Sequence, residues 1–211
     1  MKRAIYLLSF RSLLLASSIC VASCSGILTS DSPAERIYWL KPLIVQQDVV
    51  ADGVKPSIAV FISAAPGLDT DRLLILEPGA RLNHYALARW PDNIPEVLES
   101  LLRTTLESTG RYSRVTTGAI SRSTDWALEL EVRELYTLAT ESDNAHMVRM
   151  VLSGYIACLE SDRAIALQAD VRIDDNRLSQ IVAAYQHALG EVSQQLVDEL
   201  AEACSNMTTA D

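Results

Sequence analysis

Residues 126–132 read Trp-Ala-Leu-Glu-Leu-Glu-Val, and this alternation of apolar and acidic side chains predicts a strand with one buried face and one wet face. The same period of two recurs in residues 147–159 and 164–173. The side chains that it directs to one face are Val148, Met150, Leu152, Ile156 and Cys158 in the first segment, and Ile165, Leu167, Ala169, Val171 and Ile173 in the second. Because only residues 160–163 join these two segments, we expect three strands in an antiparallel meander.

Two amphipathic helices flank the meander. The first is predicted over residues 94–108, where Asn93 and Glu96 resemble a capping box and Gly110 fits the C-terminal stop. The second is predicted over residues 178–204. Its apolar stripe is formed by Ile181, Val182, Tyr185, Leu189, Val192, Leu196 and Leu200. Because each helix needs cover for its apolar face, we predict a two-layer α+β sandwich whose sheet is largely antiparallel or mixed.

Shorter apolar segments before the first helix predict additional strands. They cover residues 37–40, 57–62, 72–76 and 82–87. In the strand that begins at Trp126, Glu134 falls on the inward parity. Three interpretations stay open: a bulge that changes the register, a strand that emerges into solvent there, or a functional buried carboxylate.

The N-terminus has the pattern of an exported, lipid-modified protein. Lys2, Arg3 and Arg11 precede a short apolar stretch, which falls short of the roughly 20 residues that cross a bilayer. Residues 21–24, Val-Ala-Ser-Cys, look like a bacterial lipobox, in which the thiol of Cys24 is acylated after cleavage. The alternative is an ordinary signal peptide, or an uncleaved anchor, with an incidental cysteine.

These features divide the chain into four parts. We predict a lipoprotein signal peptide at residues 1–23, a lipidated N-terminus and tether at 24–36, one domain at 37–205, and a tail at 206–211. The tether is polar and without periodicity, as expected of a linker. Ser25 follows the lipid-bearing cysteine, where an aspartate usually retains such lipoproteins at the inner membrane, so we expect delivery to the outer membrane, facing the periplasm.

Composition and charge exclude several classes of protein. Hydrophobic residues make up 49% of the chain, which is enough for a core and excludes wholesale disorder. The formal charge of -9 becomes -12 when the three basic residues of the signal are removed, and a nucleic-acid-binding protein would need a basic face instead. The four cysteines have no Cys-x-x-Cys spacing, which excludes a zinc ribbon or finger.

Motifs for metal binding and catalysis are also missing from the sequence. The histidines are His84, His146 and His187, and none has a second histidine or a cysteine three or four residues away. No nucleophile elbow, phosphate-binding loop or dinucleotide-binding glycine pattern occurs. We therefore predict a protein that is not an enzyme and has neither a metal nor a cofactor other than its covalent lipid.

Two carboxylate groupings have simpler structural explanations. Asp69 and Asp71 could form an acid/base pair, but residues 66–69, Pro-Gly-Leu-Asp, read first as a turn. Residues 174–176, Asp-Asp-Asn, could suggest a cation loop, yet between a strand and a helix they serve as a turn and a helix cap.

Two cysteines remain after cleavage and acylation. Cys158 lies on an inward strand face and Cys204 lies at the end of the last helix. In an oxidising compartment they either form a disulfide or stay as two separately buried thiols, and the sequence leaves both alternatives open. A bridge that closes a loop of this length would contribute on the order of 3 to 4 kcal/mol.

Taken in order, these segments resemble a known family. They are the lipobox, residues 37–40, the segment from Pro66 to Leu76, residues 85–90, and the helix opened by Ile94 and Pro95. This order is similar to the ABC-type transport auxiliary lipoprotein family over roughly residues 37–203. One departure is residues 77–81, Glu-Pro-Gly-Ala-Arg, where the family commonly has a run of polar and arginine residues.

The resemblance implies a non-catalytic lipoprotein of the outer membrane. Its partners would be an MCE-domain protein and the components of an ABC transporter for phospholipid or other hydrophobic cargo, and it would act alone or as a homo-oligomer. Tyr85 and Trp90 match aromatic positions of the family and are either core or helix-staple residues, or part of a docking surface. The alternative functions are binding of a hydrophobic ligand in a groove between sheet and helix, and an enzyme whose nucleophile the sequence does not reveal.

Overall fold

A computed structural model describes residues 34–46, 54–118, 124–140, 145–158 and 161–205. The described residues from Glu35 onward form one compact unit. The predicted signal peptide, the lipidation of Cys24 and the C-terminal tail lie outside the described residues.

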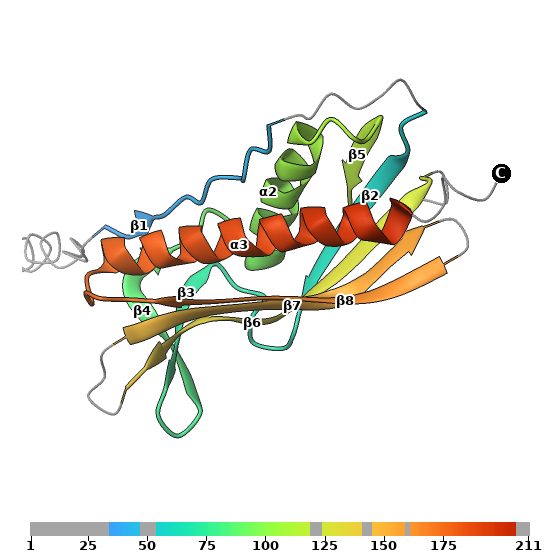
Figure 1. Ribbon diagram of the computed structural model, residues 1–211. Helices are drawn as coiled ribbons and strands as arrows, with labels where there is room; N and C mark the ends of the chain where they lie inside the picture. Colours follow the sequence, from blue (N-terminus) through green and yellow to red (C-terminus); the bar gives the residue numbers. More distant parts are fainter. Residues whose placement is uncertain (1–33, 47–53, 119–123, 141–144, 159–160, 206–211) are drawn as a thin grey trace, which may run out of the picture. The chain divides into compact units, whose positions relative to one another are not determined.

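The described residues form an eight-stranded sheet and two helices (Figure 1). The strands are β1 (Arg36–Ile37), β2 (Ser57–Ala64), β3 (Arg72–Glu77), β4 (Arg81–Arg89), β5 (Arg114–Thr117), β6 (Trp126–Ala139), β7 (Ala145–Cys158) and β8 (Ser161–Arg172). The helices are α2 (Ile94–Ser108) and α3 (Leu178–Ser205). Both helices lie close to their predicted bounds, and the α+β arrangement of sheet and helices is confirmed.

Strand β6 is the axis of the sheet. Along one edge it pairs with β7, which pairs with β8, and both pairings are antiparallel, so the predicted meander is confirmed. Its other edge is shared: residues 126–132 pair with β2 and residues 137–138 pair with β3, both in parallel. The sheet is therefore mixed, and it divides on one side of β6 into a β2–β5 branch and a β3–β4–β1 branch.

A bulge in β6 lies at the point of this division. Val132 faces Leu152 and Glu134 faces Val151, so Arg133 is an extra residue without a pairing position. The bulge returns Leu135 to the buried face, and it leaves Glu134 half-buried. Of the interpretations of Glu134, the change of register is therefore correct.

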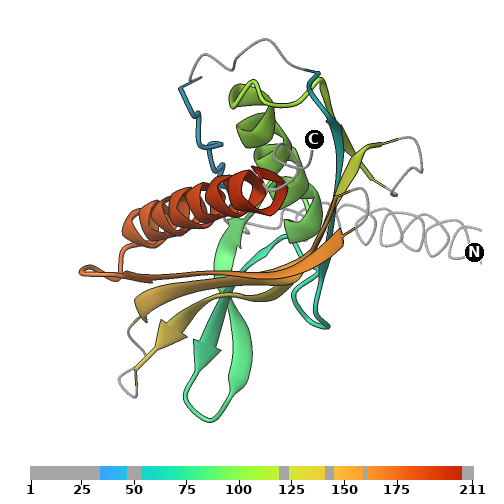
Figure 2. The same ribbon diagram turned by 45° about the vertical axis from the view of Figure 1, so that its right-hand side comes forward.

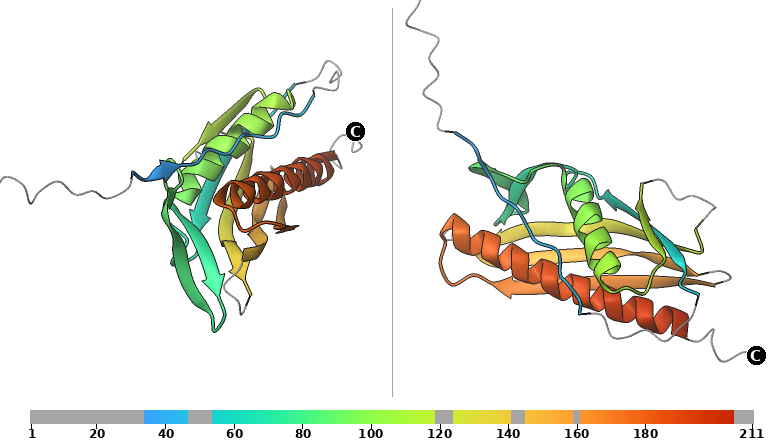
Figure 3. Two further views of the ribbon diagram at one scale, coloured as in Figure 1. Left: turned by 90° about the vertical axis from the view of Figure 1, so that its left-hand side faces the viewer. Right: turned by 90° about the horizontal axis from the view of Figure 1, so that it is seen from above.

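Both helices lie on one face of the sheet (Figure 3). Helix α3 packs on β7 and β8, and α2 packs on β2 and β5. The predicted stripe of α3 is buried at Ile181, Tyr185, Leu189, Val192, Leu196 and Leu200. Large apolar side chains of the two helices and of the meander fill the core between the two layers.

The structure differs from the expectations in three places. Instead of a strand at residues 37–40, the structure has the two-residue strand Arg36–Ile37, followed by one more bond from the Tyr38 N–H to the carbonyl of Arg89. The chain then leaves the sheet, because its backbone N–H groups at Lys41 and Val45 bond to side chains of α3 and α2 instead. Strand β5 was not predicted, since its four residues bury only Val115. Asn93 is the N-cap of α2 without a side-chain cap bond, so the capping box is wrong, whereas Gly110 ends the helix with a φ of 64°.

Candidate functional site

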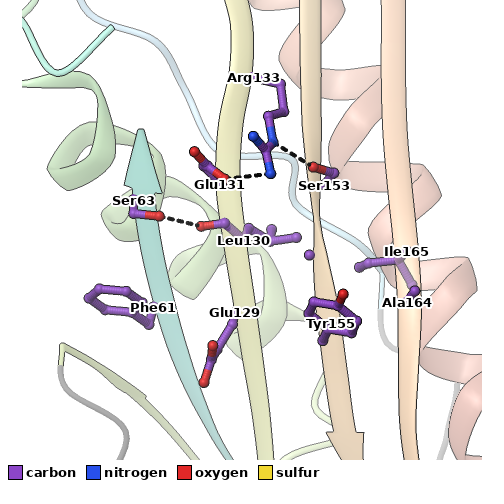
Figure 4. A pocket seen from close by; sticks show the side chains of 11 residues that line it. Phe61, Ser63, Glu129, Leu130, Glu131, Arg133, Ser153, Tyr155, Ala164 and Ile165 are labelled. Atoms are coloured by element: carbon purple, nitrogen blue, oxygen red, sulfur yellow. Dashed lines mark hydrogen bonds and ion pairs between the residues drawn. The ribbon is translucent and has the colours of Figure 1, made fainter. Parts of the chain in front are cut away.

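The face of the sheet opposite the helices is open, and the register of the strands places its side chains in rows. Phe61 of β2 lies beside Glu129 of β6, which lies beside Tyr155 of β7, and Ala164 of β8 completes this row. Phe61 is 39% exposed and Tyr155 is 58% exposed. Two aromatic rings thus flank a carboxylate on a solvent-facing surface (Figure 4).

A shallow groove of about 330 Å³ runs along this row. The next row, in which Ser63, Glu131 and Ser153 are adjacent, also lines the groove. Arg133, the residue of the bulge, forms an ion pair with Glu131 at 2.7 Å and donates to Ser153 Oγ at 3.1 Å. The groove is therefore polar at one end and aromatic at the other.

Gly154 sets the close approach of β6 and β7 beneath the groove. A Cβ atom at this position would lie 1.8 Å from the carbonyl oxygen of Glu129, so any side chain would force the two strands apart. A glycine in the middle of a strand is a sequence signal of such an approach. The register of the same two strands places Glu129 and Tyr155 next to each other.

Beyond the bulge, the open face carries a row of polar side chains that pair with one another. Tyr136, Arg149 and Asp170 are adjacent across β6, β7 and β8. Arg149 binds Asp170 at 2.8 Å, and this hydrogen bond lowers the pKa of the Asp170 carboxyl. Burial, followed by a hydrogen bond to the Glu134 carboxylate, raises the pKa of Tyr136 to about 12.

Trp90, one of the two aromatic residues named from the sequence, is a core residue in this structure. Its side chain is 1% exposed, and its ring packs edge-on against Tyr185 of α3 with 5.2 Å between centroids. Its backbone N–H donates to the carbonyl of Asp71 at 2.7 Å. The core alternative therefore describes Trp90, and its indole is not accessible to a partner.

Tyr85 also points inward, though it is only partly buried. Strand β4 has an irregular segment here: pairing passes from Leu74–His84 to Arg72–Arg89, and Leu87 has a φ of 59°. The hydroxyls of Tyr85 and Thr137 are 2.8 Å apart. Burial raises the pKa of the Tyr85 phenol.

The side chains of Thr137 and Tyr185 both form hydrogen bonds with the backbone carbonyl of Leu74. Each hydroxyl donates to the oxygen of Leu74 at 3.2 Å. Burial raises the pKa of Tyr185 well above its usual value. Tyr85 is therefore part of a hydrogen-bonded cluster that joins the β3–β4 hairpin to β6 and α3. The hairpin itself extends away from the rest of the sheet (Figure 2).

The histidines named from the sequence stay apart. His84, His146 and His187 are all exposed, on β4, β7 and α3 respectively. In the part of the chain that the structure describes, no group of three or more histidine, cysteine, aspartate and glutamate side chains could hold a metal ion.

Two of the aspartates that the sequence suggested as catalytic or cation-binding residues, Asp71 and Asp175, form ion pairs or turn hydrogen bonds in the structure. Asp69 is exposed, whereas Asp71 lies 3.4 Å from Arg89 and 3.6 Å from Arg72. Both arginines also bind Glu35, so this charge cluster ties the start of the domain to β3 and β4. In the Asp-Asp-Asn segment, Asp175 accepts the backbone N–H of Arg177 at 3.0 Å, as expected of a turn.

Of the two cysteines that could form a disulfide, the structure describes the side chain of Cys158 only. Cys158 is 2% exposed at the end of β7. The side chain of Cys204 lies outside the described residues, so the disulfide stays a prediction. Among the described helices, none combines the length and the apolar character that crossing a membrane requires.

The chain is similar in sequence to one known family and in structure to several solved proteins. The model of the family described as "ABC-type transport auxiliary lipoprotein component" matches residues 40–197. The chain is similar to the crystal structure of a Xanthomonas campestris protein described under the family DUF330, with a TM-score of 0.66 and 19% identity, over 82% of this chain and 100% of that one. No curated protein matches the chain.

Two further solved structures share the fold at lower identity. The crystal structure of an uncharacterized protein has a TM-score of 0.61 and 8% identity, over 80% of this chain and 99% of that one. A hypothetical protein of Chlamydia trachomatis has a TM-score of 0.51 and 9% identity, over 72% of this chain and 100% of that one.

Proposed function

Because the chain belongs to the family of ABC-type transport auxiliary lipoprotein components, we propose that it is a non-catalytic, lipid-anchored component of an ABC/MCE transport system for phospholipid or other hydrophobic cargo. The anchor is the acylated Cys24 in the outer membrane, and the domain faces the periplasm. The observation that carries this proposal is the family match over most of the folded domain.

The open face of the sheet supports a role in contact rather than in chemistry. Its exposed aromatic rings, Phe61 and Tyr155, are residue types that are enriched at protein interfaces. The polar groups around them are ordinary sheet-surface side chains, and the arginine and glutamate at the end of the groove neutralise each other. Such a face suits a partner that docks on it.

The space between the sheet and α3 is filled by side chains. Trp90, Tyr185, Met150 and Leu152 are each at most 1% exposed there. A hydrophobic ligand would have to displace this core, so binding of cargo between sheet and helix is not favoured over the auxiliary role.

Affinity purification from envelopes tests the proposal. The full chain with a C-terminal tag is expressed in the organism of origin, so that its native partners are present. It is extracted in a mild detergent and purified, and the co-purifying proteins are identified by mass spectrometry. We expect enrichment of an MCE-domain protein together with an ABC permease or ATPase. A Cys24→Ala chain is the control for anchoring, and recovery of neither component with the acylated protein would contradict the proposal.

A further inference from the structure

We propose that the groove on the open face binds an arginine side chain of a partner protein, held between Phe61 and Tyr155 and paired with Glu129. This inference deepens the proposed function and rests on it for the assumption that the open face meets a protein partner. It is carried by the geometry of the row, by the charges around it and by the size of the groove.

The geometry of the row suits a flat cation. Phe61, Glu129 and Tyr155 are in register on three successive strands, so the two aromatic positions are separated by two strand spacings, roughly 10 Å. A cation above Glu129, midway between the two strand positions, lies about 5 Å from each of them, which brings both rings within reach of the roughly 6 Å over which a cation is attracted to an aromatic face. Figure 4 shows the Glu129 carboxylate between the two rings.

The charges of the open face single out Glu129. Glu131 is paired with Arg133, and Asp170 is paired with Arg149. Within the described part of the chain, Glu129 takes part in no ion pair or side-chain hydrogen bond. Its carboxylate is exposed beside two apolar rings, an arrangement that a cation from outside would complete.

The size and the shape of the groove favour a side chain over a lipid. Its volume of about 330 Å³ lies at the lower end of the roughly 300–1,000 Å³ of small-molecule sites. The small side chain of Ala164 leaves room at the end of the row, beside Tyr155. Arginine is preferred to lysine because its planar guanidinium stacks on aromatic rings and forms paired bonds with a carboxylate.

Titration with two peptides tests this inference. The mature full chain is purified in dodecyl maltoside, and the amide signals of Glu129 and Tyr155 are followed by NMR. Two Gly/Ser peptides are added that differ in one residue, arginine or citrulline, which has the same shape without the charge. We expect the arginine peptide to shift both signals and to bind at least tenfold more tightly than the citrulline peptide, with an affinity that falls as salt is added.

Variants then assign the interaction to this row. Glu129→Gln and Tyr155→Leu should each weaken binding of the arginine peptide several-fold, whereas Asp69→Asn, which changes an exposed carboxylate outside the groove, should leave it unchanged. Circular dichroism and the amide spectrum verify that each variant is folded. Equal binding of the two peptides, or equal binding by wild type and Glu129→Gln, would overturn the inference.

A third probe separates a lipid from a protein. Glycerophosphocholine carries the zwitterionic headgroup of a common phospholipid, including its choline cation, without the acyl chains. If it shifts the same signals in a Glu129-dependent way while the arginine peptide does not, the groove takes a lipid headgroup and the proposed occupant is wrong. None of these titrations contains a transport component, so their failure leaves the proposed function standing, and failure of the affinity purification leaves the peptide result standing.

Discussion

The side-chain amide of Gln195 in α3 forms two hydrogen bonds with the backbone of Gln168 in β8. The N–H of Gln168 donates to Oε1 at 3.0 Å, and Nε2 donates to the Gln168 carbonyl at 2.8 Å. The amide takes the place of a neighbouring strand on this edge of the sheet. Gln186, nine residues earlier in the same helix, forms the same pair of bonds with the backbone of Lys41.

The first prediction concerns this edge. Gln195→Ala frees the N–H and carbonyl of Gln168, which should lower the free energy of unfolding by about 1 kcal/mol. It should also favour strand-to-strand association, because an uncovered edge is a template for pairing. Thermal unfolding and light scattering measure the two effects. Gln194→Ala, at an exposed neighbouring position, is the control, and equal behaviour of the two variants would show that the edge contact is unimportant.

The second prediction concerns Gly154. Gly154→Ala places a methyl group against the carbonyl of Glu129, so the two strands must separate, and we expect a loss of about 2–3 kcal/mol in chemical denaturation. Gly190→Ala is a matched control, since a Cβ in that helical position has no atom within 4 Å. It should raise stability by up to about 1 kcal/mol. A neutral Gly154→Ala would refute the close approach.

The third prediction separates a core role of Trp90 from a docking role. Trp90→Ala should lower the free energy of unfolding by about 3–5 kcal/mol, because the indole is buried against Tyr185. Trp39→Ala, at a tryptophan that is 74% exposed, should change it by less than about 0.5 kcal/mol. Urea unfolding of both variants measures the two free energies of unfolding. A Trp90→Ala variant as stable as wild type would contradict the core role and favour the docking role.

The fourth prediction concerns pH. Asp125 accepts hydrogen bonds from the backbone N–H and the hydroxyl of Ser57 at 2.7 and 2.8 Å, and these bonds lower the pKa of its carboxyl below the usual 3.8. A lowered pKa stabilises the folded state above the unfolded-state pKa, and this stabilisation is lost as the pH falls through the folded-state pKa.

Asp125→Asn should therefore show a smaller loss of thermal stability than wild type when the pH is lowered from about 6 to about 2.5. The remaining loss would come from Glu35, Asp170 and Asp175, whose pKa values are lowered by hydrogen bonds to arginine side chains. Asp69→Asn serves as the control, and parallel pH profiles for wild type and Asp125→Asn would contradict the assignment.

The fifth prediction concerns the anchor. Cys24→Ala removes the thiol that the lipobox presents for acylation, so we expect a folded domain that no longer fractionates with the outer membrane. Membrane fractionation with immunodetection measures this, and circular dichroism verifies the fold. A variant that sediments with the outer membrane as wild type does would exclude lipid anchoring through Cys24.

The family resemblance and most of the fold could be predicted from local patterns. The period of two in residues 126–132, 147–159 and 164–173 reports which face of each strand is buried, and short connections force neighbouring strands to pair. The stripes of α2 and α3 report helices in the same way. The bulge at Arg133 was foreseeable as one alternative because Glu134 broke the alternation.

The candidate site depends on contacts between residues far apart in the sequence. Phe61 and Glu129 meet only because β2, and not β3, takes the first half of the β6 edge, and no local pattern encodes that choice of partner. The aromatic residues named from the sequence were placed by the same long-range packing: Trp90 is buried because Tyr185 of the last helix covers it.

The sequence by itself determined the strands, the helices and the face that each one buries, since these follow from side-chain periodicity. Only the tertiary structure decided which exposed side chains share a surface, because strand pairing sets distances that periodicity leaves open.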